Sequence, residues 1–79
     1  MPLFYFDVRD NGQLFPDEEG HELPDITSAE TEASEAAAAI ARDVLPTRHG
    51  GELTVQVMDE QRLPVLTVTV EMFVVRKKR

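Results

Sequence analysis

One stretch, Thr27 to Leu45, constrains the fold of this 79-residue chain more than any other. It is rich in alanine and glutamate, which are strong helix formers. Its apolar residues recur at steps of three and four, so they share one face of a helix. That face consists of Ala29, Ala33, Ala36, Ala37, Ile40, Ala41 and Val44. The sequence predicts a single helix whose small inward side chains let it lie close to a partner layer.

The start of this helix has two candidate caps. Thr27 and Glu30 have the spacing of a capping box, in which a hydroxyl and a carboxylate each accept a backbone N–H. Asp25 is the rival cap residue. At the other end, Pro46 cannot extend the helix, and His49 to Gly51 predict a loop beyond it.

Segments with strand character flank the helix on both sides. Residues 3–9 alternate apolar with polar or aromatic side chains, residues 10–12 (Asp-Asn-Gly) predict a tight turn, and residues 13–15 form a short return strand. After the helix, residues 52–59 and 63–75 alternate in the same way and predict a second hairpin.

The predicted fold class is α+β, with the element order β-β-α-β-β. We expect a two-layer sandwich in which the helix covers one face of a four-stranded, mainly antiparallel sheet. Counted along the chain, the expected strand order is 2-1-3-4, and the alternative order is 2-1-4-3. Pro64 suits an edge strand, which favours the first order. Residues 1–75 are predicted to form a single domain, and residues 76–79 a basic C-terminal tail.

Charge is distributed unevenly along the chain. Of eight basic residues, the last four are Arg76 to Arg79, which leaves four basic against 15 acidic residues in 1–75, a net charge of −11 there. Such an acidic body repels nucleic-acid phosphates and anionic membranes. No cysteine, no signal-like N-terminal run and no membrane-length apolar run is present. We therefore expect a cytoplasmic protein that binds neither membrane nor nucleic acid.

Three motifs carry a resemblance to a known family. Phe4 to Gly12 reads FYFDVRDNG, Pro16 to Asp25 reads PDEEGHELPD, and Val57 to Leu66 reads VMDEQRLPVL. With these motifs on either side of an alanine-rich helix, the chain resembles a family of short bacterial proteins, a domain of unknown function, along most of its length. The resemblance implies a single independent domain. It implies no activity, so no site residue is carried over.

The acidic loop is the first candidate site. Its side chains could offer oxygen ligands to Ca²⁺ or Mg²⁺; the alternative is a solvated loop that turns the chain and caps the helix. The candidate residues are Asp17, Glu18, Glu19, His21, Glu22 and Asp25. We expect the structural alternative. We also expect no metal, cofactor or catalytic site, because the chain has two histidines, no cysteine and no serine in a nucleophile context.

The sheet face opposite the helix is the second candidate. With one helix in the fold this face is uncovered, so it is either an ordinary solvent-facing surface or a dimer interface. Its predicted residues are Tyr5, Thr54, Gln56, Met58, Val65, Thr67 and Thr69. The last strand, at an edge of the sheet, is a further candidate for dimerisation.

The sequence therefore predicts a function class rather than a reaction. We expect a small acidic, non-enzymatic module for protein–protein interaction, which binds an unknown protein or a second copy of itself. The alternative is a small regulator of the antitoxin or nucleic-acid-associated type, by analogy of fold alone. A second alternative is a cation-binding protein that uses loop 17–25.

Overall fold

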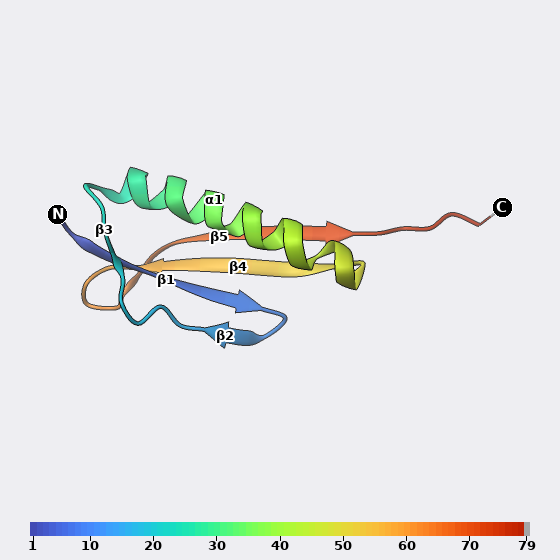
Figure 1. The fold of residues 1–79 in the computed structure, drawn as a ribbon, viewed down its shortest axis with the longest axis horizontal. Coiled ribbons are helices and arrows are strands. Elements are labelled where there is room, and N and C mark those ends of the chain that lie inside the picture. Colours follow the sequence, from blue (N-terminus) through green and yellow to red (C-terminus); the bar gives the residue numbers. More distant parts are fainter. Residues whose placement is uncertain (79) are drawn as a thin grey trace.

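A computed structural model describes residues 1–78 of the chain, as one helix lying over one sheet (Figure 1). In chain order the elements are β1 Leu3–Asp10, β2 Gln13–Phe15, β3 His21–Glu22, α1 Ile26–Val44, the short 3-10 helix η1 Pro46–Arg48, β4 Gly50–Met58 and β5 Pro64–Phe73. The predicted α+β class and the β-β-α-β-β plan are confirmed, with β3 as an unpredicted two-residue addition inside the acidic loop.

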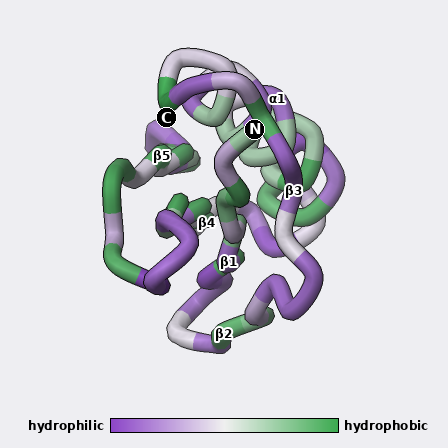
Figure 2. The backbone as a smooth tube through the Cα atoms, turned by 90° about the vertical axis from the view of Figure 1, so that its left-hand side faces the viewer, coloured by the Kyte–Doolittle hydropathy of each residue, from purple (hydrophilic) through white to green (hydrophobic). Residues whose placement is uncertain are grey.

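The sheet has the order β2-β1-β4-β5, and its pairings are antiparallel. This is the predicted order 2-1-3-4, and the alternative is wrong. Seen from the end, α1 lies to one side of these four strands (Figure 2). The extra strand β3 pairs with Leu3 and Phe4 of β1, while β2 pairs with Val8 to Asp10. The aromatic first strand is thus central, and β5 is an edge strand.

The helix begins one residue earlier than predicted, because Asp25 and not Thr27 is its cap. Asp25 has extended backbone, and its carboxylate accepts the N–H of Ser28 at 2.8 Å. This hydrogen bond satisfies one of the free donors in the first turn. The capping-box prediction at Thr27 was therefore wrong, and its rival is confirmed.

The core lies between the alanine face of α1 and the centre of the sheet. Ala29, Ala33 and Ala37 are fully buried, as are three apolar side chains of β4. Those three are Leu53, Val55 and Val57. Because the helix side chains are small, α1 lies directly over β4, and most of the buried volume comes from the sheet, as the sequence predicted.

The glycines at the start of β4 correct a second prediction. Gly50 and Gly51 were expected in a loop, but both belong to β4 and pair with Phe73 and Met72 of β5. A Cβ at Gly50 would lie 2.7 Å from the carbonyl oxygen of Met72, and the φ angle of Gly50 is +131°. Only glycine fits such a close approach of two backbones. The loop residue is His49, in left-handed conformation.

The last strand is shorter than predicted and leads into an extended segment. β5 spans Pro64–Phe73 rather than 63–75. Residues 74–78, which we call the C-terminal arm, continue beyond the sheet, away from the body of the molecule (Figure 1). Arg79, the last residue of the predicted basic tail, lies outside the described residues. Among the described residues, no helix combines the length and apolar character needed to cross a membrane.

Candidate functional site

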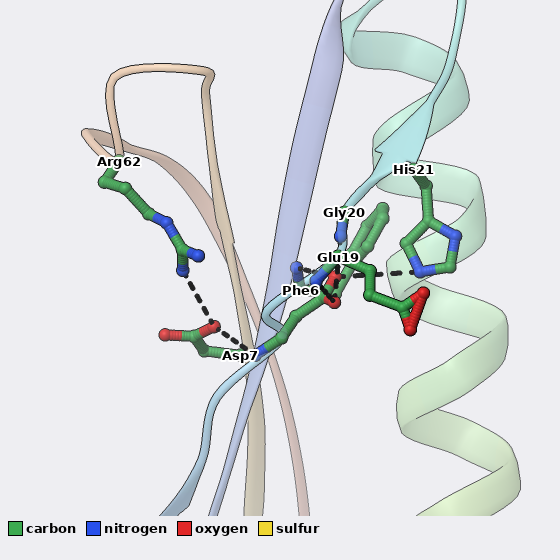
Figure 3. Close-up of polar contacts among 7 residues, drawn as sticks. Phe6, Asp7, Glu19, Gly20, His21 and Arg62 are labelled. Atoms are coloured by element: carbon green, nitrogen blue, oxygen red, sulfur yellow. Dashed lines mark hydrogen bonds and ion pairs between the residues drawn. The ribbon is translucent and has the colours of Figure 1, made fainter.

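The acidic loop is built around Asp17, which closes a gap in the edge of β1. β2 and β3 occupy the same edge and leave the N–H of Phe6 between them without a strand partner. The carboxylate of Asp17 accepts this N–H at 3.0 Å, and its other oxygen accepts the N–H groups of Glu19 and Gly20 at 3.2 and 3.0 Å. Figure 3 shows these contacts as dashed lines from the labelled Phe6, Gly20 and His21.

The electrostatics of Asp17 agree with this structural role. Partial burial alone would raise the pKa of its carboxyl. The N–H donors of Phe6, Gly20 and Glu19, with the nearby ring of His21, outweigh burial and lower the pKa below its usual value of 3.8. Asp17 is therefore ionised at neutral pH, as its role as an acceptor of backbone N–H groups requires.

A second carboxylate, Asp7 of β1, supports the loop from the other side. Its side chain is only 11% exposed and accepts the N–H of Asp17 at 2.9 Å. The guanidinium of Arg62, from the turn between β4 and β5, lies 4.0 Å from the same oxygen (Figure 3). Asp7 was absent from the predicted site residues. The one signal for it in the sequence was an acidic side chain between the apolar residues Phe6 and Val8 of a predicted strand.

The other acidic-loop candidates do not converge on a cation site. Glu18, Glu19 and Glu22 are exposed, and Asp25 is occupied as the helix cap, where the Ser28 N–H lowers its pKa. The ring of His21 lies 3.7 Å from Asp17 and edge-on to Phe6. Within residues 1–78, no three side chains of His, Asp or Glu are grouped to hold a metal ion.

A small hollow lies beside this loop. It has a volume of about 140 Å³ and is lined by Phe6, His21, Glu32 and Ala36. It brings one imidazole, from His21, and one carboxylate, from Glu32, to the same surface, and none of its lining residues is a serine, threonine or lysine.

The sheet face opposite the helix does bring most of its predicted residues together. Tyr5 pairs with Met58, Gln56 with Thr67, and Thr54 with Thr69. The hydroxyls of Thr54 and Thr69 are 3.0 Å apart and hydrogen-bonded. The remaining predicted residue, Val65, is an extra residue at a bulge, where β5 advances two residues against one on β4.

This face is less available than the sequence indicated. The guanidinium of Arg62 lies 3.7 Å above the ring centroid of Tyr5, a cation–π contact that covers the aromatic surface. Met58 is only 8% exposed. The remaining surface is mainly threonine and glutamine, so it offers little apolar area to a partner.

The edge strand β5 is the most open surface of the sheet. Its ten residues pair with β4 on one side only, and Glu71 is its only charged residue. The side chains that point toward the helix layer are only half-buried, because no further strand of the described chain covers their outer flank. They are Leu66, Val68, Val70 and Met72.

A groove runs along the same edge between the helix and β5. It has a volume of about 270 Å³ and is lined from the helix side by Ala38, Ala41, Leu45 and Pro46, with Arg42 at its rim, and from β5 by Val70 and Met72. Beyond Leu45, Arg48 in η1 makes a two-point ion pair with Asp10 at the end of β1, at 2.8 and 3.1 Å. Past the groove, Phe73 and Val75 are 79% and 81% exposed.

Comparison with known proteins identifies one family. A family model described as a domain of unknown function, DUF6894, matches residues 3–71. No curated protein and no solved structure matches the chain. The matched residues include both edges of the sheet and the acidic loop, but they end within β5, so Phe73 and the C-terminal arm lie outside the match.

Proposed function

The chain belongs to the DUF6894 family, a domain of unknown function, and we propose that it is a non-enzymatic interaction module that forms a homodimer through the open edge of β5. One observation carries the proposal. β5 presents ten residues of unpaired backbone edge, at which a second polypeptide can add a strand.

The composition of β5 favours pairing. Natural proteins protect exposed edges with short strands, prolines, inward-pointing charges or covering loops. β5 has a proline only at its first position and one charge, Glu71, near its end. Between them lies the run Val65 to Val70, which alternates apolar residues with threonine and has high strand propensity. An edge of this kind attracts another strand.

Packing provides a second argument. The helix-facing side chains Leu66, Val68 and Val70 pack against the core, and each is only partly buried. A strand added beside β5 would remove this apolar surface from water, at about 25 cal/mol for each Å² buried. A chain of 79 residues forms a small core, so it gains proportionally more from such burial than a larger protein.

A second copy is the preferred occupant because of charge. The body of the chain is strongly acidic, which disfavours nucleic acid as a partner, and the basic C-terminal arm provides a local attractive group for the acidic body of a second copy. The antitoxin or nucleic-acid-associated alternative has no comparable support. The cation-binding alternative is weakened because Asp17 and Asp25 are already used as backbone acceptors.

The test is the solution mass of the protein over a range of concentrations. We expect sedimentation equilibrium to give twice the chain mass of 8.9 kDa at high micromolar concentration and dissociation on dilution. Single-cysteine variants locate the contact, because the natural chain has no cysteine. Val68→Cys or Thr69→Cys should form a disulfide-linked dimer under mild oxidation, whereas Thr54→Cys, one strand further in, should not. A strict monomer at high micromolar concentration would contradict the proposal.

A further inference from the structure

The two ends of the molecule carry opposite charge. The start of α1 and the turn between β4 and β5 lie at the same end (Figure 1). Exposed Glu30 and Glu32 on the helix, with Asp59 and Glu60 on the turn, make this the acidic end. The one basic side chain on that turn, Arg62, is stacked on Tyr5 and directed toward Asp7.

The C-terminal arm leaves from the opposite end. It begins with Val74 and Val75, both more than half exposed, and continues with Arg76, Lys77 and Lys78. The arm makes no hydrogen bond or ion pair with the rest of the described chain. It is a short apolar and basic segment held away from the acidic end of its own molecule by the length of β5, roughly 34 Å for ten residues.

The sense and register of pairing decide where the arm of a second copy lies. Directly opposite residues in a sheet share a face, so full antiparallel pairing of β5 with its copy centres the two-fold axis on Val68 or Thr69. With either axis, residues 74–78 extend past Pro64 of the second copy, beside the turn at residues 59–63 that joins β5 to β4. The basic side chains of the arm then lie beside the acidic end of that copy, where Glu60 is exposed. Asp59 and Glu60 also accept backbone N–H groups of Gln61, Leu63 and Leu3, which fix the two carboxylates in place. A parallel pairing would instead place two basic arms side by side.

The same registers suit the apolar groove and the single charge of β5. Leu66 of the second copy lies opposite Val70 when the axis is at Val68, and opposite Met72 when the axis is at Thr69. Both Val70 and Met72 line the groove. Glu71 lies opposite Val65 or Thr67 and never opposite its own copy, where two like charges would repel. Apolar and charged groups therefore favour the same arrangement.

We infer that the two copies pair their β5 strands antiparallel and that the arm of each copy binds the acidic end of the other, with Leu66 of each copy at the groove of its partner. This arrangement rests on the proposed homodimer and adds its orientation and its second contact. The strand contact is narrow, and a stable interface removes about 800 Å² from each partner. The arm and the groove extend the buried surface on both sides of the strand.

A disulfide experiment tests the orientation. A Leu63→Cys variant and a Val75→Cys variant are mixed and oxidised mildly, and intact mass distinguishes the mixed dimer from the two self-linked dimers. Gln61→Cys replaces Leu63→Cys to cover the neighbouring register; all three positions are exposed. The antiparallel arrangement predicts mixed dimers in excess. The control pairs Val75→Cys with Gln13→Cys on β2. This pair should form disulfides only at the rate expected from random collisions between chains.

A charge experiment tests the arm. The full-length variant Arg76→Glu, Lys77→Glu and Lys78→Glu should raise the dimer Kd by about tenfold or more, and added salt should weaken the natural dimer but not this variant. The matched control is Arg9→Glu, an exposed basic residue on the sheet face, which should leave Kd within about twofold. Two results would overturn the arm contact and leave the proposed homodimer intact. One is an unchanged dimer Kd in the triple variant, and the other is an excess of self-linked Val75→Cys dimers in the disulfide experiment. A monomeric natural protein overturns both.

Discussion

The two edges of the sheet are treated in opposite ways by the same chain. The β1 edge is covered by two very short strands, β2 and β3, and by a loop whose Asp17 carboxylate occupies the position between them. The β5 edge has ten consecutive residues, and no segment within residues 1–78 covers it. Both edges start from strands with similar apolar alternation, so the difference comes from the next segment of chain: β1 leads into a covering loop, whereas β5 leads into the C-terminal arm.

This difference shows that closing an edge requires a specific acceptor as well as nearby chain. The loop after β2 could have left Phe6 with a free backbone donor, but Asp17 accepts it and also fixes the turn at Gly20. In the described part of the chain, no loop brings a corresponding carboxylate to the outer edge of β5. The molecule is therefore protected from strand addition on one side only. Because each copy has one open edge, an assembly formed by pairing of sheet edges would stop at two copies.

The largest effect is expected when the closed edge is opened. Asp17→Ala removes the acceptor of three backbone N–H groups in a partly buried position, and we expect it to lower the free energy of unfolding by about 2 to 3 kcal/mol. Urea unfolding at low protein concentration measures this loss without a contribution from dimerisation. Glu18→Ala, an exposed neighbour, is the matched control and should change stability by less than about 0.5 kcal/mol. Equal losses in the two variants would contradict the role of Asp17.

A glycine comparison tests the same edge in a second way. Gly20 has a φ angle of +78°, and an added Cβ would lie 3.1 Å from atoms of Leu3 and Tyr5. Gly12, in the β1–β2 turn, has a φ angle of +82° and open space around it. Both alanine variants lose about 1 kcal/mol or more through the left-handed backbone, but Gly20→Ala should lose about 1 kcal/mol beyond Gly12→Ala because of crowding. Thermal unfolding of the two variants measures the difference, and equal destabilisation would show that the loop does not pack tightly on β1.

The sequence was sufficient for the main plan of the fold because the relevant signals are local. Alternation in residues 3–9 and 52–59, the Asp-Asn-Gly turn at 10–12 and the spacing of the alanines each depend on neighbours within a few residues. Strand order came from Pro64 and from the antiparallel return of the helix. These elements are confirmed with boundary shifts of two residues or fewer.

The features that the sequence did not predict depend on distant partners. Strand β3 has two residues, too few for any periodicity, and exists because it meets the start of β1. The acidic loop was weighed as a cation site and expected to be structural instead, but nothing local shows that the partner of Asp17 is the N–H of Phe6. Gly50 was assigned to a loop for the same reason, since the carbonyl of Met72 that excludes a side chain comes from another strand.

A smaller effect is expected from charging the open edge. Thr69→Lys and Thr54→Lys each remove the same hydroxyl pair and add one lysine to the same sheet face, but only Thr69 lies on β5. In the proposed homodimer the two copies of residue 69 lie near the two-fold axis, so the ammonium groups of the two lysines would repel each other. We expect Thr69→Lys to raise the dimer Kd about tenfold, or 1.4 kcal/mol, and Thr54→Lys to leave it within about twofold. Sedimentation equilibrium of both variants measures this, and equal weakening would remove the β5 edge from the interface.

The smallest expected effect is the response of the closed edge to acid. The pKa of Asp17 in the folded chain lies below its usual value of 3.8, because the backbone donors led by Phe6 outweigh its partial burial. A carboxyl whose pKa is lowered by folding contributes stability that is complete above the unfolded pKa and is lost as the pH falls through the folded pKa. The natural protein should therefore lose stability below about pH 4, and Asp17→Ala should lose less over the same range.

Asp25, whose pKa the Ser28 N–H lowers, contributes in the same direction, so Asp25→Ala is the comparison that separates the helix cap from the edge. Urea unfolding from pH 6 to pH 3 measures all three proteins. If Asp17→Ala loses stability as steeply as the natural chain, the acid response belongs to other carboxylates, and closure of the β1 edge depends on the shape of the loop rather than on the charge of Asp17.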